Sequence, residues 1–230
     1  MLNEQSTVIK NAYLRYIREN KQDGMNKKDA DKEAKAISDN ILDWDEEANK
    51  MFLAMLPTYL QASERSNALA NTLFLTQDNK VLFNIIREDV LQWINTEGAK
   101  KITQVTDTTK NIVRREISKG LQEGLSVNKI SNNLTDKIKE LSKGRAVTIA
   151  QTEIHNTFTY TREQNMKSAG FKRWRWITAR DEKVRTSHVR VNNEIRKIGE
   201  KFSNGLVRPG DPNGPIEEIA NCRCEVIPVD

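Results

Sequence analysis

Histidine and cysteine, which can bind a metal or take part in nucleophilic chemistry, are scarce in this 230-residue sequence, and all of them lie in its last third. Both histidines and both cysteines lie there, the cysteines within one Cys-Arg-Cys tripeptide. Two imidazoles and two thiolates are a ligand set of tetrahedral zinc sites. The candidate cofactor is therefore a structural zinc, and its candidate ligands are His188, Cys222 and Cys224 with either His155 or Asp181.

Other interpretations of these residues stay open. Cys-X-Cys is less typical of zinc sites than Cys-X2-Cys, so the two thiols could instead pack as small hydrophobic groups near a C-terminal strand. His188 beside either cysteine could form a base–nucleophile pair. A metal-dependent nuclease could use Asp181, His188, Asn193 and Glu194. Neither spacing makes a complete catalytic constellation, so we expect no catalytic residues and no enzymatic activity.

The elements that must position these residues change character along the chain. Residues 1–144 carry apolar side chains at i, i+3 and i+4, the spacing of amphipathic helices, with a break near Pro57. Ser126 is expected to cap one helix. A second, long helix is predicted from Arg145 to about Ser168, with Gly170 as its C-terminal cap.

After that helix the period changes from helical to alternating. The segment "FKRWRWIT" places Trp174 and Trp176 on one face and two arginines on the other, which predicts a strand. The remaining sequence is rich in Gly, Pro, Asn and Asp and predicts loops and short strands. We therefore expect an α+β protein. A mainly helical region over 1–144 would bind partners, and a small module over 145–230 would combine a long helix with short antiparallel strands.

Two residues of the predicted long helix stand out by the face that they occupy. Glu153 falls within an apolar stripe, where a carboxylate needs a partner to offset its desolvation. We expect that partner to be a basic residue such as Arg185. His155 projects to the opposite side of the helix, which argues against it as a zinc ligand.

The basic residues are unevenly distributed along the chain. The net charge is +5, yet residues 141–190 alone hold eleven Lys and Arg against four Asp and Glu, a net +7. Such a segment can contact nucleic-acid phosphates, although a solvated basic face would look the same. Trp174 and Trp176 could add base stacking, or belong to the core. The candidate nucleic-acid contacts are Arg173, Arg175, Arg180 and Lys183.

No segment reaches the roughly 18 apolar residues of a membrane span, and the N-terminal segment lacks the apolar stretch of a signal peptide. We therefore expect no membrane partner and synthesis in a cytosol. Disulfides are rare in that compartment, and a Cys-X-Cys ring would be strained. The two cysteines are thus expected to be thiols or metal ligands.

Four separated blocks of the sequence occur in an order that resembles one family. They are the helix "RAVTIAQTE", an aromatic–basic strand ending in "WIT", the segment "DEKVRTSH" and, after "GDPNGPIEEIA", the terminal "NCRC". This order resembles the tailed-phage head-morphogenesis family, the minor head proteins similar to the F protein of Mu-like phages. The sequence departs from the family's usual residues at Gln151, Thr186 and Asn193.

The resemblance implies a structural minor head protein of a tailed phage or prophage, associated with the portal and acting in head assembly and in DNA packaging or ejection. The implied partners are the portal protein, a major capsid or scaffolding protein and packaged double-stranded DNA. The implied location is the virion, inside the head near the portal, after synthesis in the host cytoplasm. A DNA-binding protein that travels with the genome and a metal-dependent nuclease are the alternatives.

The resemblance also bears on the terminal block. As a family block it is expected to close the module, with Asn221 bonded to backbone in a turn and Arg223 paired with a carboxylate. The cysteines would face the interior or a zinc shared with His188. One buried polar network is further implied, formed by Arg145, Glu153, Asp181, Arg185 and His188.

Overall fold

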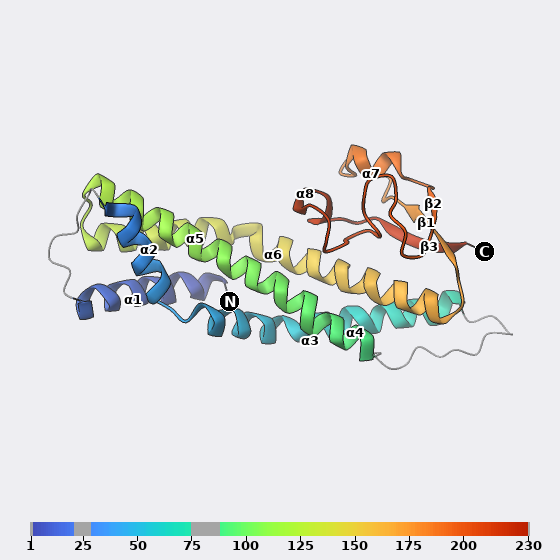
Figure 1. Ribbon diagram of the computed structural model, residues 1–230, viewed down its shortest axis with the longest axis horizontal. Coiled ribbons are helices and arrows are strands. Elements are labelled where there is room, and N and C mark those ends of the chain that lie inside the picture. The colour runs from blue at the N-terminus through green and yellow to red at the C-terminus, as the bar shows by residue number, and fades with distance from the viewer. Residues whose placement is uncertain (1, 21–28, 75–87, 230) are drawn as a thin grey trace. The chain divides into compact units, whose positions relative to one another are not determined.

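The computed structural model describes residues 2–20, 29–74 and 88–229. These residues form long helices and one small antiparallel sheet (Figure 1), which confirms the predicted α+β class with a mainly helical N-terminal region. Among the helices of these three ranges, none is long and apolar enough to cross a membrane.

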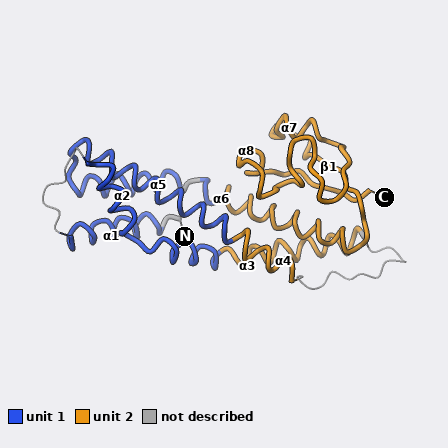
Figure 2. Tube along the Cα trace, in the orientation of Figure 1, with its two compact units in different colours: residues 1–54, 99–146 blue, residues 55–98, 147–230 orange. Residues whose placement is uncertain are grey.

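Two stretches of sequence make up each of the chain's two compact units (Figure 2). Residues 1–54 and 99–146 form the first unit, and residues 55–98 and 147–230 form the second. The C-terminal module therefore shares its unit with a stretch that ends about fifty residues earlier in the chain.

The first unit is a group of helices around one apolar core. Its elements are α1 (Leu2–Asn20), α2 (Ala30–Asn40), the first part of α3 (Trp44–Phe74), α5 (Ala99–Glu123) and the first part of α6 (Val127–Ser168).

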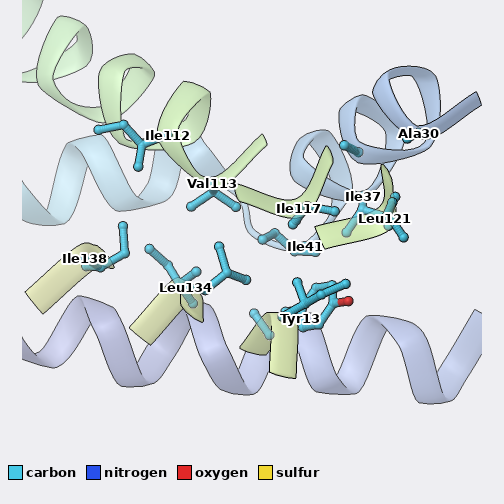
Figure 3. Close-up of a cluster of buried hydrophobic side chains, with 14 residues drawn as sticks. Tyr13, Ala30, Ile37, Ile41, Ile112, Val113, Ile117, Leu121, Leu134 and Ile138 are labelled. Carbon is cyan, nitrogen blue, oxygen red and sulfur yellow. The ribbon is translucent and has the colours of Figure 1, made fainter. Parts of the chain in front are cut away.

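Apolar side chains at helical spacing fill the core of this unit. Tyr13 of α1, Ile117 of α5 and Leu134 of α6 are fully buried and converge in Figure 3. Gly120 lets α5 come close to α6, because a Cβ atom there would lie 2.5 Å from Cγ1 of Ile130. The predicted amphipathic pattern is therefore the one that the helices use to pack.

Two predicted helix breaks are wrong. α3 runs through Pro57, whose side chain is exposed while Met55 and Tyr59 beside it are buried. Packing on both sides thus holds the helix in spite of the hydrogen bond that proline cannot donate. α6 is one continuous helix where two were predicted, and Gly144 within it adopts φ +78° without ending it.

Two predicted helix ends are confirmed. Ser126 precedes α6, and its hydroxyl accepts a hydrogen bond from the Lys129 amide (3.3 Å). Gly170 follows α6 at φ +86°, and the Phe171 amide then donates to the Met166 carbonyl (3.1 Å). This is the closure that a left-handed glycine permits at a helix C-terminus.

The second unit packs a small α+β module beside the C-terminal half of α6. Its further elements are α4 (Glu88–Trp93), the π-helical turn η2 (Ile94–Gly98), β1 (Arg173–Ile177), α7 (Thr186–Arg190), β2 (Ile195–Lys197), α8 (Ile216–Ile219) and β3 (Glu225–Val229). In the sheet, β1 lies between β2 and β3 and runs antiparallel to both.

A buried polar seam joins α3 to α6 within the second unit. The Thr161 hydroxyl donates to Ser63 (3.2 Å), and the Asn165 amide donates to Asn67 (3.0 Å). All four side chains are buried. A buried polar group left without a partner costs about 1–3 kcal/mol, so these pairs favour one register between the two helices.

The alternation predicted for β1 is confirmed by burial. Trp174 and Trp176 are fully buried, and the Trp176 indole meets Phe202 edge-on, with ring centroids 5.1 Å apart. Both indoles belong to the module's apolar core. They therefore cannot serve as the stacking platform for bases that the sequence left open.

Candidate metal centre

Three side chains with metal-binding atoms meet in the interior of the module. His188 Nδ1 lies 3.4 Å from Cys224 Sγ and 3.7 Å from Cys222 Sγ. The ligand atoms of all three residues lie within 4.8 Å of one another, and each side chain is buried. Both cysteines are free thiols. The structure thus brings together three of the five residues that the sequence proposed as zinc ligands.

The short segment between α8 and β3 positions the two thiols. Asn221 opens it at φ +53°, a left-handed conformation that asparagine tolerates, and its amide donates to Thr152 of α6 (3.0 Å). Past Asn221 the two cysteines are buried and Arg223 between them is exposed. The terminal block thus faces the interior with its sulfur atoms, as the sequence predicted.

Arg223 holds the outer side of this segment. Its guanidinium donates two hydrogen bonds to the carboxylate of Asp181, at 2.6 and 2.7 Å. This hydrogen-bonded pair holds the pKa of Asp181 below its usual range. Both carboxylate oxygens of Asp181 therefore accept hydrogen bonds from Arg223, and Asp181 is not part of the cluster around His188.

A carboxylate occupies the other side of the His188 ring. Nε2 of His188 lies 2.9 Å from Oε2 of Glu218, without the geometry of a hydrogen bond. The same Glu218 oxygen accepts a hydrogen bond from Ser187 (2.7 Å). The imidazole is therefore held between two sulfur atoms and a carboxylate. Glu218 was not anticipated, because nothing in the spacing of "IEEI" relates it to a histidine thirty residues earlier.

The contact between the two cysteine sulfurs affects the pKa of both thiols. The hydrogen bond with Cys224 lowers the pKa of Cys222, and His155 and His188 lower it further. The same contact raises the pKa of Cys224, and burial adds to that effect. The contact between the two sulfur atoms therefore acts in opposite directions on the two thiols.

A cavity of about 670 Å³ adjoins the cluster, and Cys222 forms part of its wall. Its other lining residues include His155, Lys183 and Glu225. Burial raises the pKa of Glu225. The hollow is therefore lined by a thiol, an imidazole and a carboxyl group, all of which can bind a metal or an ordered water.

His155 lies beside Cys222 on the wall of this cavity, so the face of α6 that carries it is covered by the terminal block. The C-terminal half of α6 is thus buried on two sides. One side meets Tyr59 of α3, and the other meets Asn221 of the terminal block. A helical wheel with one buried face cannot represent this packing.

The remaining members of the predicted polar network have different partners. Arg185 donates to the carbonyl of Ala220, and thereby anchors the end of α8. Arg145 belongs to the first unit, where it donates to the carbonyl of Val105 (3.3 Å). The contacts described for these residues therefore distribute them over separate sites.

Glu153 is buried, as the sequence predicted for its place on α6. The hydrogen bond described for it comes from the Tyr59 hydroxyl (3.2 Å), and burial raises the pKa of that tyrosine. Its pairing with Arg185 stays a prediction.

The candidate nucleic-acid contacts differ in accessibility. Arg173, Arg180 and Lys183 are exposed, and Arg175 is half-buried. Of the nuclease candidates, Glu194 accepts hydrogen bonds from Ser203.

A second buried charge site was missed by the sequence analysis. The guanidinium of Arg208 pairs with Glu163 of α6 at 3.3 Å and lies over the rings of Tyr160 and Trp93. These two rings stack on each other, with centroids 4.6 Å apart. The only signal in the sequence was the Pro-Gly-Asp-Pro loop that follows Arg208, which reads as an exposed turn.

Comparison with known proteins supplies the family context. A family model described as "Phage Mu protein F like protein" matches residues 111–227, half of the chain. The chain is similar to uncharacterized protein YqbB of Bacillus subtilis, at 22% identity over 70% of the chain and 55% of that protein. It is also similar to an uncharacterized protein of Haemophilus influenzae, at 28% identity over 55% of the chain and 26% of that protein.

The chain therefore spans about half the length, or less, of the curated relatives that it matches. No solved structure matches it. The family model covers all of the blocks that carried the resemblance, from the α6 helix to the terminal Cys-Arg-Cys segment. On this match the chain belongs to the Phage Mu protein F-like family.

Proposed function

We propose that this chain is a structural minor head protein of a tailed phage or prophage, associated with the portal and acting in head assembly and in DNA packaging or ejection. The observation that carries the proposal is the family match over residues 111–227. That match supports a phage head-related protein. The portal contact and the part in packaging or ejection are the finer steps that we propose.

The first unit supplies a surface that suits a protein partner. A polar hollow of about 660 Å³ on this unit is lined by Asp31 of α2 and by three basic residues of α5. These are Arg114, Arg115 and Lys119. We propose that this hollow receives acidic side chains of a head protein, since exposed cations steer and orient such contacts.

Quantitative mass spectrometry of purified heads, assembled with and without the portal protein, tests the proposal. We expect the chain in a few copies per head, measured against the major capsid protein, and its loss from heads that lack the portal. A chain that never co-purifies with heads would contradict the head role. A chain that is equally abundant without the portal would contradict the portal association alone.

Charge reversal tests the proposed surface in the same assay. Arg115→Glu with Lys119→Glu should lower incorporation into heads. Lys129→Glu is the matched control, because it reverses an exposed charge on α6 of the same unit, outside the hollow. If the double variant is incorporated into heads as well as the Lys129→Glu control, the partner binds outside the hollow.

DNA binding is the second candidate function, favoured by the exposed Arg173, Arg180 and Lys183. Each phosphate contact steepens the dependence of log binding constant on log salt by about 0.9. Replacing all three residues with Ala should therefore reduce the magnitude of this slope by up to about 2.7, the sum for three phosphate contacts. An unchanged slope, or binding that ignores salt, would exclude these side chains as phosphate contacts.

A further inference from the structure

We propose that His188, Cys222 and Cys224 bind a zinc ion, and that His155 completes a tetrahedral ligand set. The ion would connect α7 with the terminal segment through the three buried side chains, and would add α6 through His155. The proposal does not depend on a role in phage heads.

The spacing of the three buried ligand atoms carries the argument. With zinc–sulfur bonds of about 2.3 Å and zinc–nitrogen bonds of about 2.0–2.1 Å, a tetrahedral site separates its nitrogen and sulfur ligands by roughly 3.6 Å. His188 Nδ1 lies 3.4 Å from one sulfur and 3.7 Å from the other. One ion can therefore contact all three atoms without a change in the backbone.

The orientation of the His188 ring is a second, independent observation. A histidine that binds a metal through one ring nitrogen commonly donates the other N–H to a carboxylate, which fixes the tautomer and the ring. Here Nδ1 faces the two sulfurs, while Nε2 lies 2.9 Å from Glu218, itself held by Ser187. The Nε2–Glu218 contact does not yet have the geometry of a hydrogen bond, so the ring would need only to align with a carboxylate that is already beside it. A thiol–imidazole hydrogen bond alone needs no such carboxylate.

His155 is the candidate for the fourth position, although its ring nitrogens lie outside the group formed by the other three ligand atoms, so its side chain would have to turn toward the ion. It lines the cavity beside Cys222, and its Nε2 atom is buried with no hydrogen-bond partner among the described residues. A buried nitrogen without a partner is costly, and a metal bond would remove that cost. With two sulfur and two nitrogen ligands, the set matches the preference of zinc.

Metal analysis of the purified full chain is the first test. We expect about one zinc per chain, retained through gel filtration, and two thiols that become reactive toward DTNB only after a strong chelator is added. Well under one zinc per chain, in protein that was offered zinc and whose thiols react while it is folded, would overturn the proposal. This result needs no variant.

Neighbouring glutamates of α8 provide a matched pair of variants. Glu218→Gln should weaken zinc binding by about 10–100-fold in competition with a chromogenic chelator, because the His188 ring loses its orienting carboxylate. Glu217→Gln changes the exposed neighbour on the same turn and should bind as the parent does. Equal affinities would remove the orienting role from Glu218 and, with it, the second argument for the site.

Cobalt substitution tests the fourth ligand separately. The Co²⁺ form should show thiolate charge-transfer bands and the intense visible absorption of a four-coordinate site, and Cys222→Ser or Cys224→Ser should reduce the charge-transfer bands. His155→Gln should shift the visible bands while it leaves the thiolate bands in place. A His155→Gln spectrum identical to that of the parent would show that His155 is not a ligand.

Discussion

Replacing Glu163 with Gln should destabilise the second unit by about 3 kcal/mol, because it removes the negative charge beside a buried guanidinium. The two side chains are 6% and 7% exposed, with Arg208 Nη1 3.3 Å from Glu163 Oε2. Burial lowers the pKa of Arg208, yet a guanidinium stays charged at neutral pH. The variant therefore keeps a cation in the interior with a neutral amide at its ion-pair position, while the carboxylates of Asp211 and Glu97 continue to act on it from nearby.

The magnitude follows from the contacts that remain. Loss of one partner of a buried ion pair costs about 3–5 kcal/mol. The Arg208 guanidinium still lies 5.1 and 5.9 Å from the ring centroids of Tyr160 and Trp93, which favours the lower end of that range. Lys167 also loses its bond to Glu163 (2.7 Å), but it is 46% exposed and contributes less than about 1 kcal/mol.

The measurement is hydrogen exchange of α6 peptides combined with urea unfolding, so that the two units are followed separately. The control is Glu140→Gln, since Glu140 pairs with Lys137 on the same helix but is 70% exposed. That variant should lose less than about 1 kcal/mol. If Glu163→Gln shifts the unfolding midpoint no more than the control does, the buried pair does not stabilise the fold. Adding Arg208→Met to Glu163→Gln should recover part of the loss, because the buried charge is then gone.

Three further predictions concern single residues. Gly120→Ala should lower the melting temperature, because the added Cβ would lie 2.5 Å from Ile130 Cγ1. Overpacking of this kind costs about 1–3 kcal/mol, which exceeds the roughly 1 kcal/mol that alanine contributes to helix stability over glycine. A higher melting temperature would show that the side chains around residue 120 rearrange to accept the methyl group. Gly210→Ala should destabilise more strongly, since Gly210 has φ +70° and its Cβ would run into the Asn156 side chain, and thermal unfolding of the two variants side by side decides this. Burial, and the nearby charge of Glu33, raise the pKa of Tyr13 from 10.0 to about 12, so its contribution to stability is complete below pH 10 and is lost as the pH rises towards 12. Absorbance at 295 nm should therefore show this tyrosine ionising above the normal range in the native protein, and a Tyr13→Phe variant with the same titration curve would refute the shift.

Local signals in the sequence were sufficient for some features of the fold. The left-handed glycine at 170, the Ser126 cap and the alternation around Trp174 each depend on neighbouring residues, and all three are confirmed. The two cysteines and His188 were proposed together because the types of their side chains suit one metal. Their meeting in one buried cluster agrees with that choice.

Features that depend on distant packing could not be predicted in this way. Ser63 and Thr161 are ordinary polar residues of two helices, and only the fold shows that they pair across 98 positions of sequence. The place of His155 beside Cys222 could not be predicted, because its helix has neighbours on two sides. Pro57 was predicted to break a helix, because proline lacks the backbone N–H that a helix needs. The packing on both sides that offsets this loss cannot be recognised in the sequence.

The discontinuous composition of the second unit limits how its module can be exchanged between related chains. A cut before residue 145 would keep the sheet and the candidate metal centre, but would expose Thr161 and Asn165 without Ser63 and Asn67 opposite them. The segment matched by the family model starts within α5 and likewise omits residues 55–98. Recombination that preserves a stable module must therefore transfer two separate stretches together, or rely on α3 sequences that already present the same polar pattern. A functional copy of this module is accordingly inherited together with α3, which lies outside the residues matched by the family model.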